Sequence, residues 1–292
     1  MYQIIDGKEL AKKIREQLRV ESDELKKKGI TAKLAVILVG DNAASKVYIK
    51  NKSKACEDVG VEFEEIILDN TTKMEKLLSI IDELNARKDI NGILLQSPIP
   101  EGLNIQEAFE RIDYRKDVDG FNSINAGKLM IGQDCFVSCT PYGVIKMLEN
   151  YNIPIEGKHA VVIGRSNIVG KPVATLMMQK AYPGDATVTV CHSGTKNITE
   201  ICRQADIIIA AIGKPGFVTA DMVKDGAVVI DVGTTRVPST LTKSGFKLRG
   251  DVDFEAVSQK CSYITPVPGG VGPMTIVSLM QNTLLAAKKE LY

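Results

Sequence analysis

The stretch HAVVIGRSNIVGKP, residues 159–172, decides the fold of this chain. Its first five residues are typical of a buried strand, and Pro172 suits the first turn of a helix. Gly164 and Gly170 let the backbone approach an anion closely, and the start of a helix offers free N–H groups to a phosphate. Their spacing differs from GxGxxG, so a tight turn without a ligand stays open as an alternative on this stretch alone.

Further β signals follow this stretch along the chain. Strands are predicted at 187–191, 206–211 and 227–231, and a helix is predicted at 171–180. A second glycine-rich turn, GKPG at 213–216, follows the strand at 206–211. Because parallel strands place their carboxyl ends at one edge of a sheet, both turns are expected at that edge. The pattern predicts a doubly wound α/β domain with a dinucleotide crevice.

The turn after the second strand indicates which dinucleotide fits. A domain specific for NAD usually carries an acid there for the ribose 2′-hydroxyl, but this strand runs into CHSGTK at 191–196, which has no carboxylate. Ser193 and the planar donors of Arg165 suit a 2′-phosphate instead. The sequence therefore predicts NADP as the cofactor, with a solvated surface charge as the alternative role for Arg165.

The first half of the chain shows the same alternation. Strands are predicted at 34–39, 63–68 and 92–96, and the helices start with one from Asp6 to near Gly29. Two more helices are predicted at 45–59 and 74–84, so this half also forms a parallel sheet covered by helices. A looser stretch at 117–134 precedes a helix at 140–150, which places a domain boundary near residue 139.

Bulk properties exclude several classes of protein. The 292 residues carry a net charge of +1, so no overall field attracts nucleic acid or an anionic membrane. The amino terminus lacks the features of a secretory signal, and no apolar run approaches the roughly 20 residues of a membrane span. Six cysteines without a CxxC pair favour a reducing cytoplasm. The two histidines lie in no zinc motif, so no metal is expected.

Polar residues at predicted element ends are the catalytic candidates. Tyr48 and Lys52 lie four residues apart on one helix face, where a phenol and an amine can converge on one substrate. A lysine in an apolar cleft titrates closer to neutrality and can act as general base and acid. The alternative is that Lys52 is one solvated lysine among several. Gln96 ends a predicted strand, and Asp119 in KDVDGF is on its own better read as a turn former.

Taken in order and spacing, several segments resemble the bifunctional methylenetetrahydrofolate dehydrogenase/cyclohydrolase family of the bacterial FolD type, across essentially the whole chain. The matching segments are VGDNAASKVYIKNK at 39–52, GILLQSPIP at 92–100, KDVDGF at 116–121, CTPYGV at 139–144, GRSNIVGKP at 164–172 and PVPGGVGPMT at 266–275. The resemblance implies that Lys52 shuttles protons, Tyr48 packs on the folate, Gln96 positions Lys52 and Asp119 binds the pterin.

The resemblance also implies how the cofactor and the folate are held. The expected cofactor-binding residues are Gly164, Arg165, Ser166, Gly170, His192, Ser193, Gly213 and Thr234, with Thr234 beside the nicotinamide. Pro268, Gly269 and Gly270 would border the folate cleft. Members of this family have a folate-binding domain, here 1–139 with the returning helix at 275–292, and a Rossmann NADP-binding domain, here 140–274. Homodimerisation is a further expectation from the resemblance.

The implied reaction oxidises 5,10-methylene-tetrahydrofolate with NADP and hydrolyses the methenyl product to 10-formyl-tetrahydrofolate. The residues at three places differ from those expected for the family: Ser97, Asn122-Ser123 and Thr234-Thr235. Two alternatives are a shikimate-type NADP-dependent dehydrogenase and a catalytically silent dinucleotide-binding regulator. The combination of Tyr48, Lys52, Gln96 and Asp119 argues against both.

Overall fold

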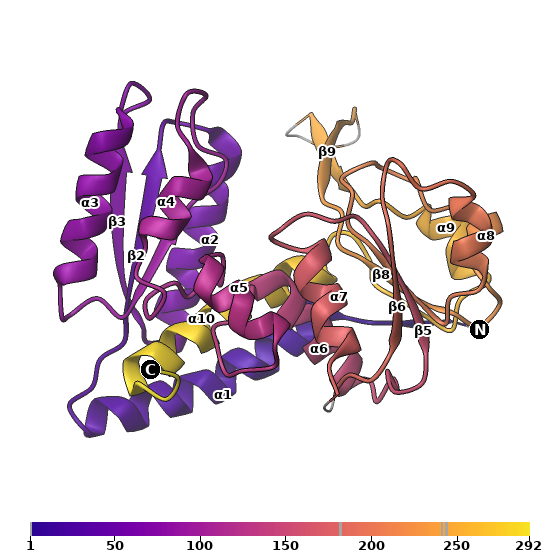
Figure 1. Cartoon of the computed structure of the whole chain (residues 1–292), viewed down its shortest axis with the longest axis horizontal. Coiled ribbons are helices and arrows are strands. Elements are labelled where there is room, and N and C mark those ends of the chain that lie inside the picture. Colours follow the sequence, from indigo (N-terminus) through magenta and orange to yellow (C-terminus); the bar gives the residue numbers. More distant parts are fainter. Residues whose placement is uncertain (1, 181–182, 241, 243–244) are drawn as a thin grey trace. The chain divides into compact units, whose positions relative to one another are not determined.

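The computed structural model describes residues 2–180, 183–240, 242 and 245–292. The chain forms two compact units. We call Lys12–Cys139 with Ile276–Tyr292 the three-stranded unit, and Met1–Ala11 with Thr140–Thr275 the six-stranded unit. The chain passes between them within the first helix, at the start of α6 (Cys139–Asn150) and within the last helix (Figure 1).

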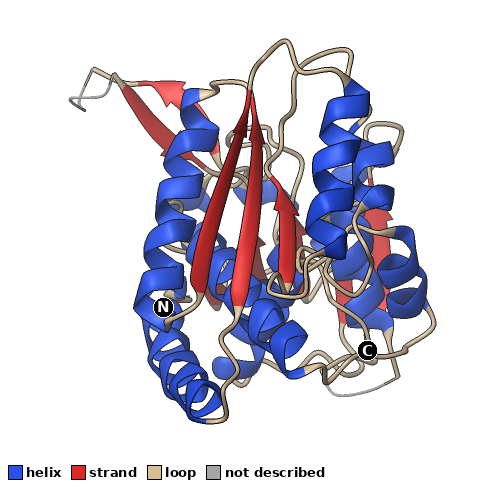
Figure 2. Ribbon diagram, turned by 90° about the vertical axis from the view of Figure 1, so that its left-hand side faces the viewer, coloured by secondary structure: helices blue, strands red, loops and turns tan. Residues whose placement is uncertain are grey.

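The three-stranded unit is built around a parallel sheet of order β3-β2-β4. Its elements are α1 (Gly7–Lys27), β2 (Lys33–Val39), α2 (Ala43–Val59), β3 (Glu62–Leu68), α3 (Met74–Ala86), β4 (Gly92–Leu95), α4 (Ile105–Arg111), α5 (Ser123–Met130) and α10 (Val271–Lys288), with α1 and α10 shared with the other unit. Figure 2 shows the three strands with helices on either side.

Both faces of the central strand β2 are buried, which explains its unbroken apolar run. Leu34, Val36 and Leu38 pack into a cluster with residues of α1, α2 and α10. The alternate residues of β2 pack into a second cluster with α3 and α4. Side chains of successive strand residues point to opposite faces, so one strand serves both cores.

The six-stranded unit contains a parallel sheet of order β1-β11-β8-β7-β5-β6. Its elements are β1 (Gln3–Ile4), α6 (Cys139–Asn150), β5 (His159–Ile163), α7 (Gly170–Met178), β6 (Thr187–Cys191), α8 (Ile198–Arg203), β7 (Ile207–Ala210), η1 (Ala220–Met222), β8 (Val228–Asp231), β9 (Thr235–Pro238), β10 (Phe246–Arg249), α9 (Phe254–Ser258) and β11 (Tyr263–Ile264). The strand order reverses between β5 and β7, which is where ligands bind in doubly wound sheets.

The helix at each end of the chain follows the sequence prediction closely. The carboxylate of Asp6 accepts the backbone N–H of Glu9 at 2.9 Å, so Asp6 caps α1 as expected. The last helix begins at Val271, four residues before the predicted start at Thr275. It returns to α1 as expected, because Lys288 forms an ion pair with Glu21.

One local prediction was wrong. The stretch at 117–134 is not loose throughout, because it holds α5, which Asn122 caps by accepting the N–H of Ile124. Near the start of the chain, Gln3–Ile4 form β1 and pair with β11, so they extend the six-stranded sheet. No helix in the described ranges is both long and apolar enough to cross a lipid bilayer.

Candidate active site

Two buried polar side chains meet in the three-stranded unit. Lys52 lies on α2, and Gln96 directly follows β4 at the carboxyl edge of the sheet; their exposed fractions are 9% and 8%. The ammonium of Lys52 donates to Oε1 of Gln96 at 2.9 Å, and Nε2 of Gln96 donates to the carbonyl of Ser97 at 2.8 Å. The second bond orients the amide so that its oxygen faces the lysine. The structure therefore brings together two residues that the sequence analysis selected separately.

Burial and one acidic neighbour set the charge of this pair. Loss of water around Lys52 lowers the pKa of its amine, and the carboxylate of Asp119 opposes this shift. Burial raises the pKa of Asp119, and the Lys52 ammonium opposes that in turn. Each group therefore favours the charged form of the other. An amine in these surroundings releases a proton more readily than one in water, as general base catalysis requires.

A thiol completes this cluster, and no motif in the sequence marks it as a site residue. Cys139, the first residue of α6, donates its thiol hydrogen to the carbonyl of Val118 at 3.4 Å. Burial raises the pKa of this thiol well above its ordinary value, and the neighbouring carboxylate of Asp119 raises it further. Asn282 of α10 donates to the sulfur at 3.8 Å. All six cysteines are buried. Local spacing could not indicate that the start of α6 lies beside residue 119.

The remaining candidate, Tyr48, and Asp117, the other acid of KDVDGF, differ in exposure. Tyr48 lies one turn before Lys52 on α2, and its 43% exposed fraction leaves part of the ring open to solvent. Asp117 is buried and accepts the backbone N–H of Asn122 at 2.8 Å and the amide of Asn125 at 2.9 Å. Burial raises its pKa to about 7. Asp117 therefore supports the turn, whereas Asp119 interacts with Lys52.

The six-stranded unit carries a hollow of about 480 Å³ at the carboxyl ends of β5, β6 and β7. Five of the predicted cofactor residues line it, namely Gly164, Arg165, Ser166, His192 and Ser193. Gly170, Gly213 and Thr234 do not line it. The full lining contains two cations, Arg165 and Lys214, and no acid. This charge suits a phosphorylated ligand.

Close backbone contacts explain the glycines of this turn. Gly164 has a φ of +123°, and a Cβ there would lie 2.2 Å from the carbonyl oxygen of Ala211. A Cβ on Gly170 would lie 2.3 Å from the carbonyl oxygen of Gly164. The hydroxyl of Ser166 accepts the N–H groups of Val169 and Gly170 at 3.2 and 3.3 Å. Any side chain at 164 or 170 would force the turn open.

The turn after β6 contains no carboxylate and is held by its own side chains. The backbone N–H of His192 donates to the hydroxyl of Thr195 at 2.8 Å. Nδ1 of the His192 ring accepts the backbone N–H of Gly194 at 3.1 Å. The histidine ring is therefore fixed with Nδ1 as an acceptor. Thr195, which is not among the predicted cofactor residues, also lines the hollow.

The remaining predicted residues are placed by backbone contacts of the six-stranded unit. Thr234 is exposed, and the hydroxyl of Thr235 donates to the carbonyl of Gly213 at 3.5 Å. In the predicted folate-bordering loop, the carbonyl of Gly269 accepts the N–H of Lys8 at 2.9 Å. Pro268, Gly269 and Gly270 belong to this unit, whereas Lys52, Gln96 and Asp119 belong to the three-stranded one.

A second hollow, of about 680 Å³, is lined by residues of the three-stranded unit that include Arg87, Lys116 and Tyr292. None of the predicted site residues lines it.

Two family models match the chain. The tetrahydrofolate dehydrogenase/cyclohydrolase catalytic domain matches residues 5–119, and the NAD(P)-binding domain of the same family matches residues 138–291. A curated relative, the bifunctional protein FolD of Phocaeicola vulgatus, is 56% identical over 291 residues, which is 99% of either chain.

Solved structures agree with these matches. The bifunctional enzyme FolD of Campylobacter jejuni, a methylenetetrahydrofolate dehydrogenase/cyclohydrolase, is 49% identical with a TM-score of 0.94 over 100% of both chains. The Trypanosoma brucei enzyme, solved with NADP cofactor and an inhibitor, is 37% identical with a TM-score of 0.94 and covers 99% of this chain and 98% of its own. With two family models spanning nearly its whole length and a relative of this identity, the chain belongs to the tetrahydrofolate dehydrogenase/cyclohydrolase family.

Proposed function

We propose that this chain oxidises 5,10-methylene-tetrahydrofolate to the 5,10-methenyl form with NADP and then hydrolyses that product to 10-formyl-tetrahydrofolate. The observation that carries the proposal is the buried Lys52–Gln96 pair beside Asp119, in a chain that belongs to this family. Solved relatives with these activities in their names support it.

In the dehydrogenase half, the protein mainly binds and aligns flat rings. Bound NADP would supply the hydride acceptor. Tyr48 offers a partly exposed ring on which the folate can stack, and the carboxylate of Asp119 can accept hydrogen bonds from the amino group of the pterin. Little proton transfer is needed in this step.

In the cyclohydrolase half, Lys52 moves the protons. Water adds to the cationic methenyl carbon and loses one proton to the neutral amine of Lys52, which returns it to the ring nitrogen that leaves as the carbon–nitrogen bond breaks. The remaining hydroxyl proton is released to solvent as the formyl carbonyl forms, so one proton leaves in each turnover. Gln96 holds Nζ in one place by accepting its hydrogen bond. Burial lowers the pKa of this amine, so its neutral fraction is larger than that of a lysine in water.

The residues of the hollow on the six-stranded unit fit NADP. Gly164 and Gly170 permit the tight turn between β5 and α7, and this turn places Arg165 and Ser166 on the wall of the hollow. Arg165 can present parallel donors to a 2′-phosphate, while no acid lines the hollow to repel it. We infer a preference for NADP over NAD from this charge.

A coupled absorbance assay tests the proposal. Purified protein is mixed with methylene-tetrahydrofolate and NADP, then NAD, while the NADPH and methenyl bands are followed. We expect wild type to reduce NADP and clear the methenyl product, and Lys52→Met to reduce NADP but accumulate methenyl-tetrahydrofolate. Lys50→Met, on an exposed position of the same helix, is the matched control and should behave as wild type.

The same assay separates the alternatives. NADP reduction with shikimate but not with the folate would favour the shikimate-type dehydrogenase. NADP binding without turnover of either substrate would favour the silent regulator. Absence of any folate-dependent reduction overturns the proposal, and clearance of methenyl product by Lys52→Met overturns the role of Lys52.

We also propose that the chain forms a homodimer. Strand β3 lies at the edge of its sheet, with β2 as its only pairing partner within the described residues, and Ile67 on it has an exposed fraction of 62%. An unpaired edge strand with an exposed apolar side chain is suited to pairing with a second copy.

A further inference from the structure

Two buried carboxylates, Asp231 and Asp251, lie beneath the predicted cofactor loops of the six-stranded unit. Asp231 is the last residue of β8 and has an exposed fraction of 3%, and Asp251 lies two residues after β10 with an exposed fraction of 0%. Carboxylates are seldom buried without strong partners. The hydrogen bonds that these two carboxylates accept therefore indicate what they do, because an apolar residue could not accept them.

Asp251 holds the loop after β7. Its Oδ2 accepts the backbone N–H groups of Ile212 and Gly213 at 2.7 and 2.9 Å. Its backbone adds to this, because the carbonyl of Asp251 accepts the N–H of Val218 at 2.9 Å. Ile212 is a wall residue of the 480 Å³ hollow, and so is Lys214, directly after Gly213. One carboxylate oxygen therefore fixes the backbone of that wall.

Asp231 holds both Asp251 and the loop after β8. Its Oδ1 accepts the N–H of Gly233 at 3.0 Å and the N–H of Asp251 at 2.9 Å, and its Oδ2 accepts the N–H of Val252 at 2.9 Å. Gly233 immediately precedes Thr234, which is predicted to lie beside the nicotinamide. The two carboxylates thus connect both loops to one segment, Gly250–Val252.

The packing around the pair leaves no room for side chains on two adjoining glycines. A Cβ on Gly233 would lie 2.4 Å from Oδ1 of Asp251, and a Cβ on Gly250 would lie 1.9 Å from Oδ2 of Asp231. Oδ1 of Asp251 is buried without a hydrogen-bond partner in the described part of the chain. An unpaired buried carboxylate oxygen is costly, which argues against a purely stabilising role for Asp251.

We propose that Asp251, supported by Asp231, is a positioning residue for the nicotinamide cofactor: it holds the loops at Ile212–Lys214 and Gly233–Thr234 in the conformation that binds the dinucleotide. This inference rests on the proposed NADP dependence. It predicts that weakening the carboxylate lowers cofactor affinity while the proton chemistry of Lys52, which needs no nucleotide, continues.

The test measures two properties of Asp251→Ala and Asp251→Asn: the affinity for NADPH, from its fluorescence on binding, and the rate of methenyl-tetrahydrofolate hydrolysis without nucleotide. Loss of two charge-assisted hydrogen bonds should weaken NADPH binding about tenfold in Asp251→Ala. Asparagine keeps a neutral acceptor of the same shape, so Asp251→Asn should weaken binding only about threefold. The rate of hydrolysis should stay within about twofold of wild type. The two hydrogen bonds that the variant loses lie in the other unit, where they do not contact Lys52.

Asp206→Ala is the matched control. Asp206 precedes β7 at the opposite edge of the same sheet, where it accepts the N–H of His159 at 3.0 Å and pairs with Lys224 at 2.5 Å. Asp206→Ala removes hydrogen bonds to a carboxylate from the same unit, as Asp251→Ala does. It should nevertheless leave the NADPH affinity at the wild-type value.

Two outcomes overturn the proposal: folded Asp251→Ala that binds NADPH as wild type does, or Asp206→Ala that weakens NADPH binding as much as Asp251→Ala. If Asp251→Ala does not fold, the proposal is tested on Asp251→Asn instead, by measuring its NADPH affinity and the rate of amide hydrogen exchange at Ile212 and Gly213. Faster exchange there together with weaker binding supports the proposal, and unchanged NADPH affinity contradicts it. If wild type binds NADPH but does not reduce NADP with the folate, the proposed function is contradicted. The NADPH affinities of wild type and the Asp251 variants can still be compared in that case.

Discussion

At the scale of single residues, the pKa of Lys52 depends on the carboxylate of Asp119. Burial lowers this pKa and Asp119 raises it, so Asp119→Asn should lower it further. The neutral amine would then be present at lower pH than in wild type. Competitive labelling of lysines with acetic anhydride across a pH series, read by mass spectrometry, gives the midpoint for Lys52. Exposed lysines in the same sample are the control, and an unchanged or higher midpoint contradicts the coupling.

The sequence could predict part of this cluster, and physical reasons explain the limit. Lys52 and Tyr48 were selected because helix geometry places residues four apart on one face, and Gln96 because a buried strand ends there. The contact between Cys139 and Asp119 joins residues whose spacing follows no helix or strand period. Likewise, nothing local to Gly250–Val252 indicates that Asp251 contacts Ile212 and Gly213, 38 or more residues away.

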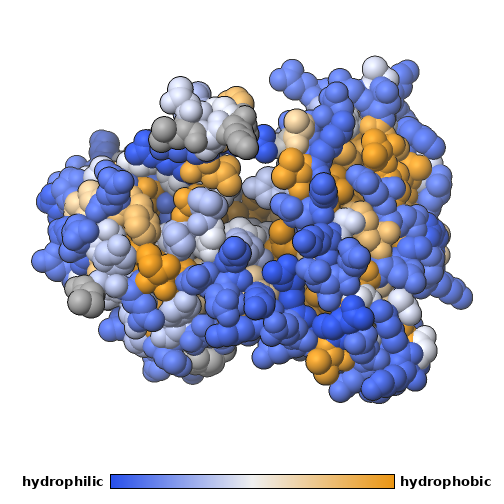
Figure 3. All heavy atoms as spheres, turned by 180° about the vertical axis from the view of Figure 1, so that it is seen from behind, coloured by the Kyte–Doolittle hydropathy of each residue, from blue (hydrophilic) through white to orange (hydrophobic). Residues whose placement is uncertain are grey.

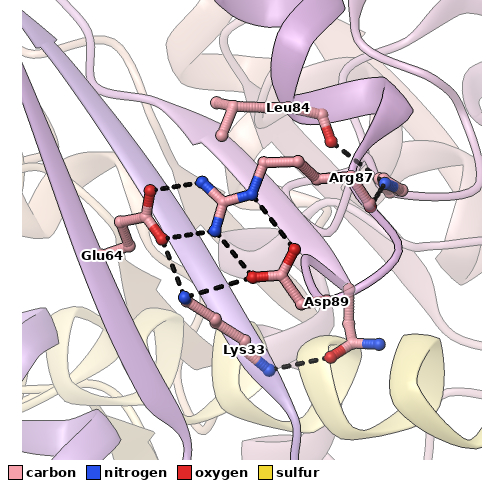
Figure 4. Close-up of polar contacts among 7 residues, drawn as sticks. Lys33, Glu64, Leu84, Arg87 and Asp89 are labelled. Carbon is pink, nitrogen blue, oxygen red and sulfur yellow. Dashed lines mark hydrogen bonds and ion pairs between the residues drawn. The ribbon is translucent and has the colours of Figure 1, made fainter.

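At the scale of elements, an ion-pair network ties together the amino-terminal edge of the three-stranded sheet (Figure 4). Glu64 of β3 accepts two hydrogen bonds from Arg87 at 2.6 and 2.9 Å and pairs with Lys33 of β2 at 2.8 Å. Asp89 pairs with the same two cations. These partners, Arg87 first, lower the pKa of Glu64 to about 2. The network joins β2 and β3 to the segment that leads into β4.

The lowered pKa gives a pH-dependent prediction for Glu64→Gln. A carboxyl whose pKa is lower in the folded state stabilises the fold above its unfolded pKa, and this contribution is lost as pH falls toward about 2. Glu64→Gln should therefore lower the free energy of unfolding by about 1 kcal/mol at pH 7, with the difference from wild type shrinking below pH ~4.5. Urea unfolding at pH 7, 5, 4 and 3 measures it.

The control is Asp23→Asn, which removes an isolated exposed pair with Arg19 on α1 and should cost less than about 0.5 kcal/mol. A difference between wild type and Glu64→Gln that is constant with pH would contradict the assignment.

Element prediction from sequence succeeded where a pattern is long. The apolar run of β2 and the periodicity of α1 gave both elements within about two residues, because several side chains repeat the same signal. Strand β1 has two residues, too few to show alternation, and only its pairing with β11 defines it. Helix α5 was missed because its cap, Asn122, stands in a run of Gly, Asn and Asp that resembles a loop.

At the scale of the whole molecule, alternating strand and helix signals were sufficient to predict two parallel sheets. They could not assign residues 1–11, whose membership depends on one short pairing with the six-stranded sheet. Polar side chains cover much of the surface that Figure 3 shows, with hydrophobic side chains exposed in places. Such exposed apolar residues are common on monomeric proteins, so they do not by themselves indicate an interface. An unpaired strand edge is a further feature by which an interface can be predicted.

The proposed dimer gives the last prediction, because the edge of β3 satisfies that criterion. Light scattering after size-exclusion chromatography should give wild type twice the mass of one chain. Ile67→Lys places a charge on the edge strand and should yield a monomer, since charged side chains on an edge oppose strand pairing. Val20→Lys is the matched control, because Val20 of α1 is 61% exposed against 62% for Ile67. A monomeric wild type contradicts the dimer, and a dimeric Ile67→Lys variant moves its interface away from β3.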